Sequence, residues 1–347
     1  MITPRENYII AIHGGKPQWI PDFWEDTNML PFNKYELKPI EDGLTQDFFG
    51  ITYMGNMPVH SRRPWKEISD WRKYTFPDLT EIDWEAEEKY YKEIIDPTKL
   101  IRCDVGGHGL LLTLANALGF EDALVSLIEE DDEVLAFLRA YTDYMKECIH
   151  YAAKYIKPDE ISICEDTSNA RGPFLSKETY RKLFRPFMQE LCDLAHSYNM
   201  AFNIHNCGDP QYLFEEYVEM GVNVVNACNY SKSLIEFRKK YGPVLCIEGG
   251  WDSQGPCAMH DAPEELVKQS VRDCYDRYAA IGGYVTLGNG IVVGPDPKAM
   301  KQKVTWCQEE ANRIRFEYYG KKSPEELEML SNYTNGVDFI WKIMMIE

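Results

Sequence analysis

The chain has 347 residues, of which 44% are hydrophobic and 13% aromatic, a composition typical of a folded protein with an ample core. Its formal net charge of −19 argues against nucleic acid and anionic membrane surfaces as partners. It lacks both a signal-peptide core at the N-terminus and the ~18 consecutive apolar residues of a membrane helix, so we expect a cytoplasmic protein.

The first part of the chain, residues 1–99, combines most of the tryptophans with proline-rich connections. Two stretches, Pro17–Trp24 and Phe48–Tyr53, are candidate strands, and Asp83 is a candidate N-cap for a following helix. The aromatic density indicates either a pocket for an apolar ligand, with Trp24 as a candidate substrate contact, or simple packing over one end of the remaining chain.

From Leu100 onwards, strand-like and helix-like stretches alternate. The predicted strands are the stretch that starts at Leu100 and residues 160–167, 201–209, 221–229, 244–252 and 282–290. The predicted helices cover 111–156 with a break near Gly119, the stretch after Ser176 as N-cap, 212–219, the stretch ending before Gly242, 261–282 with Asp261 as cap, and the stretch from Asp296 to about Tyr318.

This alternation implies parallel strands with right-handed crossovers. We therefore predict an α/β fold, a (β/α)8 TIM-type barrel that forms a single domain over residues 1–347, with the elaborated N-terminal segment 1–99 packing over it. A doubly wound open sheet is the alternative. It is disfavoured because no G-x-G-x-x-G follows an early strand.

The stretch Ala201–Asp209, AFNIHNCGD, contains a candidate metal site. Side chains alternate along a strand, so His205 and Cys207 share one face, with Cα atoms roughly 6.5 to 7 Å apart. Both can reach one ion at the ~2.0 to 2.3 Å distances that zinc prefers. The alternative is a core histidine beside an inert buried cysteine. The ten cysteines follow no tight framework, which favours reduced thiols over disulfides.

The ends of parallel barrel strands face a common cavity, and the predicted strands here end in polar residues. Burying several such groups is costly unless a metal or substrate compensates, which favours the metal interpretation. Glu165 is the first choice for a third ligand, followed by Glu248 and Cys246. Glu165 could instead pair with Arg171. The strand-end residues are Cys103, Asp104, Glu165, Asp166, His205, Cys207, Asn226, Asn229, Glu248, Asp252 and Asn289.

The remaining candidates have both a catalytic and a structural interpretation. Asp166 and Asp252 are candidate acid/base groups or partners of a ligating histidine, and either could be a helix cap or loop anchor. His108, in GGHG, either contacts substrate or caps the helix that starts near Leu110. Glu248 and Asn289 are further candidate substrate contacts at strand ends.

Four segments of the chain resemble motifs of the uroporphyrinogen decarboxylase superfamily, more closely its cobalamin-dependent methyltransferase branch. They are EDTSNARGPFLS (165–176), HNCGD (205–209), YGPVLCIEGGWD (241–252) and GGYVTLGNGI (282–291), in the family's order and spacing. The resemblance covers nearly the whole chain. It implies a TIM-type barrel, a zinc ion at the barrel mouth and a methyl-transfer reaction that involves a corrinoid.

Two departures from the family pattern narrow this expectation. The decarboxylase's arginine-rich R-Q-A-G-R-Y element is replaced here by DFWEDTNM, so porphyrinogen decarboxylation is not expected. The thiol-methylating enzymes of the branch take a third zinc ligand from the cysteine of GCGI, where this chain has Asn289, which makes Glu165 more attractive as the replacement.

What remains is similar to the substrate-side methyltransferases of corrinoid-dependent O-demethylases. The resemblance implies transfer of a methyl group from a methoxylated aromatic compound, a phenyl methyl ether, to the Co(I) of a separate corrinoid (cobalamin) protein. That protein is expected to dock transiently at the barrel mouth, with zinc as Lewis acid. The alternatives are methyl transfer between a corrinoid protein and a thiol, tetrahydrofolate or a methylamine, and a non-catalytic barrel that binds a corrinoid protein. A homodimer is retained as an option.

Overall fold

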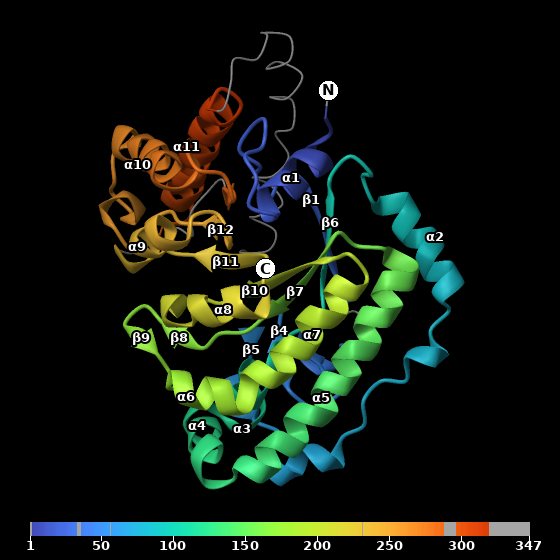
Figure 1. Ribbon diagram of the computed structural model, residues 1–347. Helices are drawn as coiled ribbons and strands as arrows, with labels where there is room; N and C mark the ends of the chain where they lie inside the picture. Colours follow the sequence, from blue (N-terminus) through green and yellow to red (C-terminus); the bar gives the residue numbers. More distant parts are fainter. Residues whose placement is uncertain (1, 33–35, 56, 231, 288–295, 319–347) are drawn as a thin grey trace. The chain divides into compact units, whose positions relative to one another are not determined.

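The computed structural model describes residues 2–32, 36–55, 57–230, 232–287 and 296–318 (Figure 1). The chain divides into two compact units. The first unit comprises Met1–Asn28, Pro97–Leu100 and Asn223–Glu347, and the second comprises Met29–Asp96 and Ile101–Val222. Each unit is built around parallel strands and is considered by itself.

The second unit contains three parallel strands in the order β6 (Leu100–Asp104), β7 (Glu160–Cys164) and β10 (Ala201–His205). In both β7 and β10 the first four residues are buried and only the last is partly exposed. Such continuous burial is typical of parallel strands that are covered on both faces. The carboxyl ends of β7 and β10 are therefore where these strands first reach solvent.

A buried ion pair links β6 to the start of β7, and a side chain of β10 joins it. The Arg102 guanidinium donates to Glu160, and the Asn203 amide donates to the same carboxylate oxygen at 3.0 Å. Arg102 and Glu160 are also direct neighbours in the register of β6 and β7. Because all three side chains are buried, this network fixes the alignment of the strands whose ends carry the candidate site.

The helices of the second unit follow its strands in the chain, and α5 and α7 run side by side (Figure 1). Three acidic residues in the first turn of α5 complement the positive end of its helix dipole. The helices are α2 (Trp84–Ile94), α3 (Leu110–Leu118), α4 (Phe120–Glu129), α5 (Asp131–Tyr151), α6 (Lys177–Thr179), α7 (Arg185–Ser197) and α8 (Phe214–Met220).

Short strands complete the second unit. An antiparallel set is formed by β2 (Lys38–Pro39), β3 (Thr45–Gln46), β4 (Thr52–Met54) and β5 (Met57–Pro58). A two-residue hairpin joins β8 (Ser168–Asn169) to β9 (Gly172–Pro173) in the loop after β7. Strand β1 (Thr27–Pro31) lies where the first unit passes into the second.

The first unit contains a second parallel set, with the order β11 (Val224–Cys228), β12 (Cys246–Gly249) and β13 (Tyr284–Val285). Its helices are α1 (Pro4–Ile12), α9 (Lys232–Tyr241), α10 (Glu264–Tyr278) and α11 (Pro297–Arg315), and α10 packs against α11. The strands again alternate with helices, so the α/β class is confirmed.

Three predicted helix starts are confirmed by side-chain caps. Asp83 accepts a hydrogen bond from the Ala86 amide, and Ser176 accepts one from Thr179. Asp296 caps α11 in the same way. The expected break at Gly119 separates α3 from α4, and a second break that the sequence did not indicate separates α4 from α5 at Glu130.

Other predictions about the fold were wrong. Residues 17–24 form turns with one bridge at Asp22, because two prolines remove backbone donors that a strand needs. Within 48–53 only the last two residues are in a strand, β4. Asp261 does not cap α10, whose N-cap is Pro263 without a side-chain hydrogen bond.

A closed barrel of eight parallel strands is not found among the described residues. The last described strand, β13, has only two residues, and the rest of the predicted strand 282–290 lies partly in 288–295, outside the described ranges. The single-domain assignment of residues 1–347 stays a prediction. No single described helix is long and apolar enough to cross a membrane, although α3 and α4, which are bent by 115°, pass that test together.

Candidate metal-binding site

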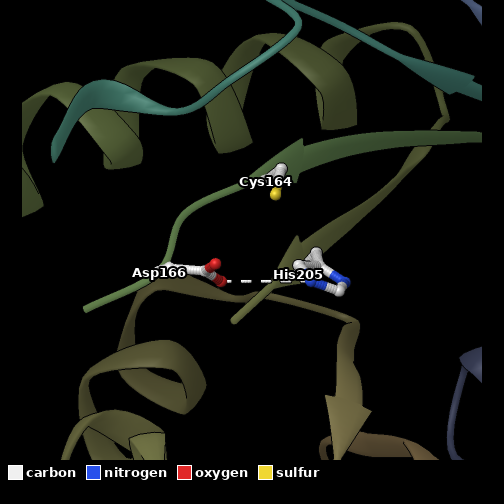
Figure 2. Close-up of side chains that lie close together, drawn as sticks. All are labelled: Cys164, Asp166 and His205. Atoms are coloured by element: carbon white, nitrogen blue, oxygen red, sulfur yellow. Dashed lines mark ion pairs between the residues drawn. The ribbon is translucent and has the colours of Figure 1, made fainter. Parts of the chain in front are cut away.

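The carboxyl ends of β7 and β10 bring together four groups that can bind a metal. His205 ends β10, Cys164 ends β7, and the two residues are direct neighbours in the strand register. One ligand atom from each of Cys164, Asp166 and His205 can be chosen so that all three lie within 4.8 Å of one another. Figure 2 shows the Cys164 sulfur directed towards the space beside Asp166 and His205.

Cys207 extends this cluster, as the sequence predicted. Its Sγ lies 3.3 Å from His205 Nε2, so the two side chains do point the same way. The Cys207 amide donates to Asp166 Oδ1 at 2.8 Å, and that oxygen lies 3.9 Å from His205 Nε2. Asp166 thus fixes the loop after β10 while its carboxylate stays beside the histidine. We call Cys164, Asp166, His205 and Cys207 the β7–β10 cluster.

Two separations around His205 fit a tetrahedral ion, and the three donors that all lie within 4.8 Å of one another are those of Cys164, Asp166 and His205. With metal–ligand bonds of about 2.0 to 2.3 Å, neighbouring donor atoms in a tetrahedron lie about 3.5 Å apart. The observed 3.3 Å between His205 and Cys207 and 3.9 Å between His205 and Asp166 bracket this value. Two thiols, one imidazole and one carboxylate are also the donor types that zinc uses. The residues present therefore fit a zinc ion.

Solvent can reach the cluster, but Cys164 is more buried than Cys207. The side chains of His205 and Asp166 are 28% and 26% exposed, and Cys207 is exposed. Burial raises the pKa of the Cys164 thiol well above its usual value, and Asp166 and Cys207 add to that rise. A bound cation would reverse this effect, because thiolates are the form that binds metals. Without a cation, Cys164 stays protonated.

Cys164, to which the sequence analysis gave no role, lies on the same side of the strand end as His205. Side chains alternate along an extended strand end, so Cys164 and Asp166 share the face of His205 and Glu165 points away. Glu165 is fully buried and accepts a hydrogen bond from the Leu111 amide at 2.8 Å, which places it at the N-terminus of α3. Burial raises its pKa to about 8.

Among the described residues, Glu165 accepts from Leu111 and forms no ion pair with Arg171, whose amide donates to Asn169. The role of Glu165 as a metal ligand stays a prediction. Sequence reasoning missed Cys164 because it took the acidic residue of the strand end as the ligand. The alternation rule, applied to EISICED as it was to AFNIHNC, would have selected Cys164 and Asp166.

His108 lies in the loop that joins β6 to α3. It does not cap α3, whose N-cap is Gly109 without a side-chain hydrogen bond. Its ring stacks on Tyr53, with centroids 5.4 Å apart. Burial lowers the pKa of His108, and the nearby Asp166 opposes this. The influence of Asp166 indicates that His108 lies close to the β7–β10 cluster.

Glu248 and Asp252, two further predicted site residues, belong to the first unit. Glu248 is fully buried and accepts hydrogen bonds from the Tyr8 hydroxyl and the Asn226 amide. Asp252 accepts a hydrogen bond from the Gln254 amide at 3.3 Å, within its own loop.

Four further residues that the sequence analysis named lie outside the β7–β10 cluster or outside the described residues. Trp24 is partly buried and its ring contacts Phe23. Cys246, the third choice as ligand, is buried in β12. Cys103 is buried in β6. Asn289 lies outside the described residues. The catalytic and substrate-binding roles of these residues stay predictions.

The N-terminal aromatic residues mostly pack on one another. Phe49 contacts the rings of Trp65, Phe76, Phe137 and Tyr141, and both Phe49 and Trp65 are only 2% exposed. A cavity of about 700 Å³ in the same unit has a mixed polar and apolar lining, formed by Ile40, Glu41, Gln46, Gly50, Thr52, Arg62, Arg63, Pro64 and Tyr74. Of the two interpretations offered for the aromatic density, packing fits these residues better.

Comparisons with known proteins agree with this architecture. The sequence profile of the family described as uroporphyrinogen decarboxylase (URO-D) matches residues 62–310. Among solved structures, a methyltransferase from Methanosarcina mazei is similar, with 13% identity, a TM-score of 0.57, and coverage of 89% of this chain and 99% of that one. At this identity the likeness concerns the fold alone. No curated protein sequence matches the chain.

Proposed function

The chain belongs to the uroporphyrinogen decarboxylase (URO-D) family, and from that premise we propose that it is a zinc-dependent methyltransferase. The proposed reaction moves a methyl group from a methoxylated aromatic compound to the Co(I) of a separate corrinoid protein. The observation that carries the proposal is the group of Cys164, Asp166 and His205, whose donor atoms lie within 4.8 Å of one another at the solvent-reaching ends of two parallel strands, with the Cys207 sulfur beside His205.

The proposed ligands are Cys164, His205 and Cys207, with Asp166 as either a fourth donor or a proton carrier. Catalytic zinc sites in proteins commonly use three protein ligands and leave one position open. When bound, zinc supplies a Lewis acid for the ether oxygen. Because the His205 and Asp166 side chains are about one quarter exposed, a substrate oxygen can approach the donors.

The proposed reaction needs a Lewis acid or a proton donor at the ether oxygen. In the proposed transfer the bond between the methyl carbon and the ether oxygen breaks, and the methyl carbon forms a bond to Co(I), which supplies the electron pair. The electrons of the broken bond stay on oxygen, so the leaving group is a phenolate that needs charge neutralisation or a proton. Asp166, close to His205 and held by the Cys207 amide, is the group that we assign to move this proton.

Family membership alone does not give this reaction, since the porphyrinogen decarboxylase belongs to the same family. The absence of the arginine-rich element in DFWEDTNM is the reason for excluding porphyrinogen as substrate. The similar solved structure from Methanosarcina mazei is a methyltransferase, which is in line with the proposal. The chain provides no G-x-S-x-G element, and none is required, because cobalt is the nucleophile.

The test is an incubation of the zinc-loaded protein with a reduced corrinoid protein and a panel of methoxylated aromatics. Formation of the methylated corrinoid, followed by its absorption spectrum, is the expected result. A signal with methylamines or thiols but with no ether would overturn the substrate class. A protein that binds zinc but transfers no methyl group from any donor would support the non-catalytic alternative.

A further inference from the structure

The loop between β6 and α3 is fastened to the strand end that carries the cluster. Val105 N donates to Ser162 O at 3.0 Å, and Gly109 N donates to Cys164 O at 2.5 Å. His108 lies between these two attachment points. Its backbone is therefore held beside β7 at the place where Cys164 and Asp166 are partly exposed.

Further contacts fix the orientation of His108. Its ring lies on the Tyr53 ring at an interplanar angle of 28°, and the Tyr53 hydroxyl donates to Asp47 Oδ2 at 2.9 Å. The Tyr141 hydroxyl donates to the His108 carbonyl at 2.9 Å. Both the ring face and the backbone of His108 are thus immobilised, as a group that positions a ligand requires.

Only one nitrogen of the His108 ring is available to a ligand. Nδ1 is buried, and among the described residues it has no hydrogen-bond partner. Nε2 is not buried, and the described residues form no hydrogen bond with it either. Since burial lowers the pKa of His108, the imidazole is neutral near pH 7 and can donate or accept a hydrogen bond through Nε2.

We propose that His108 Nε2 binds an uncharged oxygen substituent of the aromatic substrate and so selects hydroxylated aryl ethers over carboxylated ones. This inference rests on the proposed function and specifies its substrate class. The Asp166 carboxylate, whose charge acts on His108, disfavours a second negative charge at this place. A phenolic hydroxyl or an ether oxygen matches a neutral imidazole without such repulsion.

Binding can be measured without methyl transfer, by titration calorimetry of the zinc-loaded protein with 2-methoxyphenol and with 4-methoxybenzoate. His108→Phe keeps a ring on Tyr53 but removes both nitrogens. We expect it to bind 2-methoxyphenol about tenfold more weakly than the wild type, as expected for one lost hydrogen bond. His108→Gln, which can place an amide nitrogen near the position of Nε2, should recover most of the affinity.

The chain offers a matched control in a second histidine–tyrosine pair. His150 Nδ1 lies 2.7 Å from the Tyr198 hydroxyl on an exposed face, so His150→Phe should bind 2-methoxyphenol as the wild type does. If His108→Phe does not fold, His108→Leu replaces it, and thermal unfolding identifies the folded variants.

The outcomes separate the two proposals. Equal binding of 2-methoxyphenol by wild type and His108→Phe overturns the role of His108 and leaves the proposed function intact. Tighter binding of 4-methoxybenzoate than of 2-methoxyphenol overturns the selection for uncharged substituents. If the wild type binds no aromatic compound at all, the substrate class of the proposed function fails, and the inference fails with it.

Discussion

Polar groups lie at the ends of parallel strands in both units, but they differ in burial and in their hydrogen-bond partners. At the ends of β7 and β10, Cys164 and His205 are partly exposed and their donor atoms face a common space. In β12, Glu248 is fully buried and receives hydrogen bonds from Tyr8 and Asn226. The first group can accept a ligand, whereas protein donors already engage the second.

The comparison shows that a strand end alone does not identify a functional residue. A buried carboxylate is stable when protein donors surround it, and its value is then structural. A cluster of soft and hard donors that solvent can reach is the arrangement expected for a metal. Substitutions in the β7–β10 cluster should therefore lower activity, whereas substitutions around Glu248 should lower the free energy of unfolding.

The largest effect is expected for His205→Ala in the β7–β10 cluster. Loss of a zinc ligand should lower the rate of methyl transfer by about a thousandfold, equivalent to about 4 kcal/mol of barrier. Because His205 is partly exposed, the free energy of unfolding should hardly change. Rates are measured by corrinoid methylation and stability by urea unfolding, with His150→Ala as a surface control. Full activity of His205→Ala would show that the cluster is not catalytic.

Glu248→Ala should show the opposite pattern. It leaves the buried Tyr8 hydroxyl and Asn226 amide without their acceptor, so we expect a loss of about 3 kcal/mol in the free energy of unfolding. Zinc content should be unchanged. Tyr8→Phe, which removes only one donor, should cost about 1 kcal/mol. A stable Glu248→Ala protein with impaired methyl transfer would instead assign Glu248 to the site.

The two aspartates predicted from the sequence as acid/base groups should differ in their effect on the rate of methyl transfer. Asp166→Asn should lower the methyl-transfer rate about thirtyfold, or about 2 kcal/mol, because the carboxylate lies beside His205. Asp252→Asn should change the rate less than about threefold, since the Asp252 carboxylate contacts its own loop. Equal effects of both substitutions on kcat would remove this distinction between the two regions.

A smaller, pH-dependent effect is expected from Asp22 in the first unit. Burial raises its pKa from 3.8 to about 7, so between these values the folded state holds a proton that the unfolded state releases. The native state then binds more protons, and stability falls as pH rises through this window, by about 1.4 kcal/mol per pH unit at most. Asp22→Asn should flatten the profile between pH 4 and 7. Unfolding midpoints at several pH values test this, and an unchanged slope would contradict it.

The sequence predicted the alternation of strands and helices well, because buried parallel strands such as EISIC and AFNIH are short apolar runs between amphipathic stretches. Caps at Asp83, Ser176 and Asp296 followed from local hydrogen bonding, which depends on few residues. The strand predicted at 17–24 was wrong because its aromatic residues are typical of strands, while its prolines prevent strand pairing.

The candidate site was predicted in part. The proximity of His205 and Cys207 follows from strand periodicity alone, and it is present in the structure. The same periodicity places Cys164 and Asp166 on one face, but their position beside His205 depends on the register between β7 and β10, a long-range pairing that no local pattern contains. The difference between Glu248 and the β7–β10 cluster depended on which donors fold around each group. That information lies in distant residues such as Tyr8.

The zinc content of the purified protein, with and without the cluster, tests the account most directly. After dialysis against a weak chelator, mass spectrometry should find one zinc ion per wild-type chain and almost none in Cys164→Ala, Cys207→Ala or His205→Ala. Cys246→Ala, with a buried cysteine outside the cluster, should keep its zinc. A wild-type chain that binds no zinc, or a Cys164→Ala/His205→Ala variant that keeps it, would contradict the account.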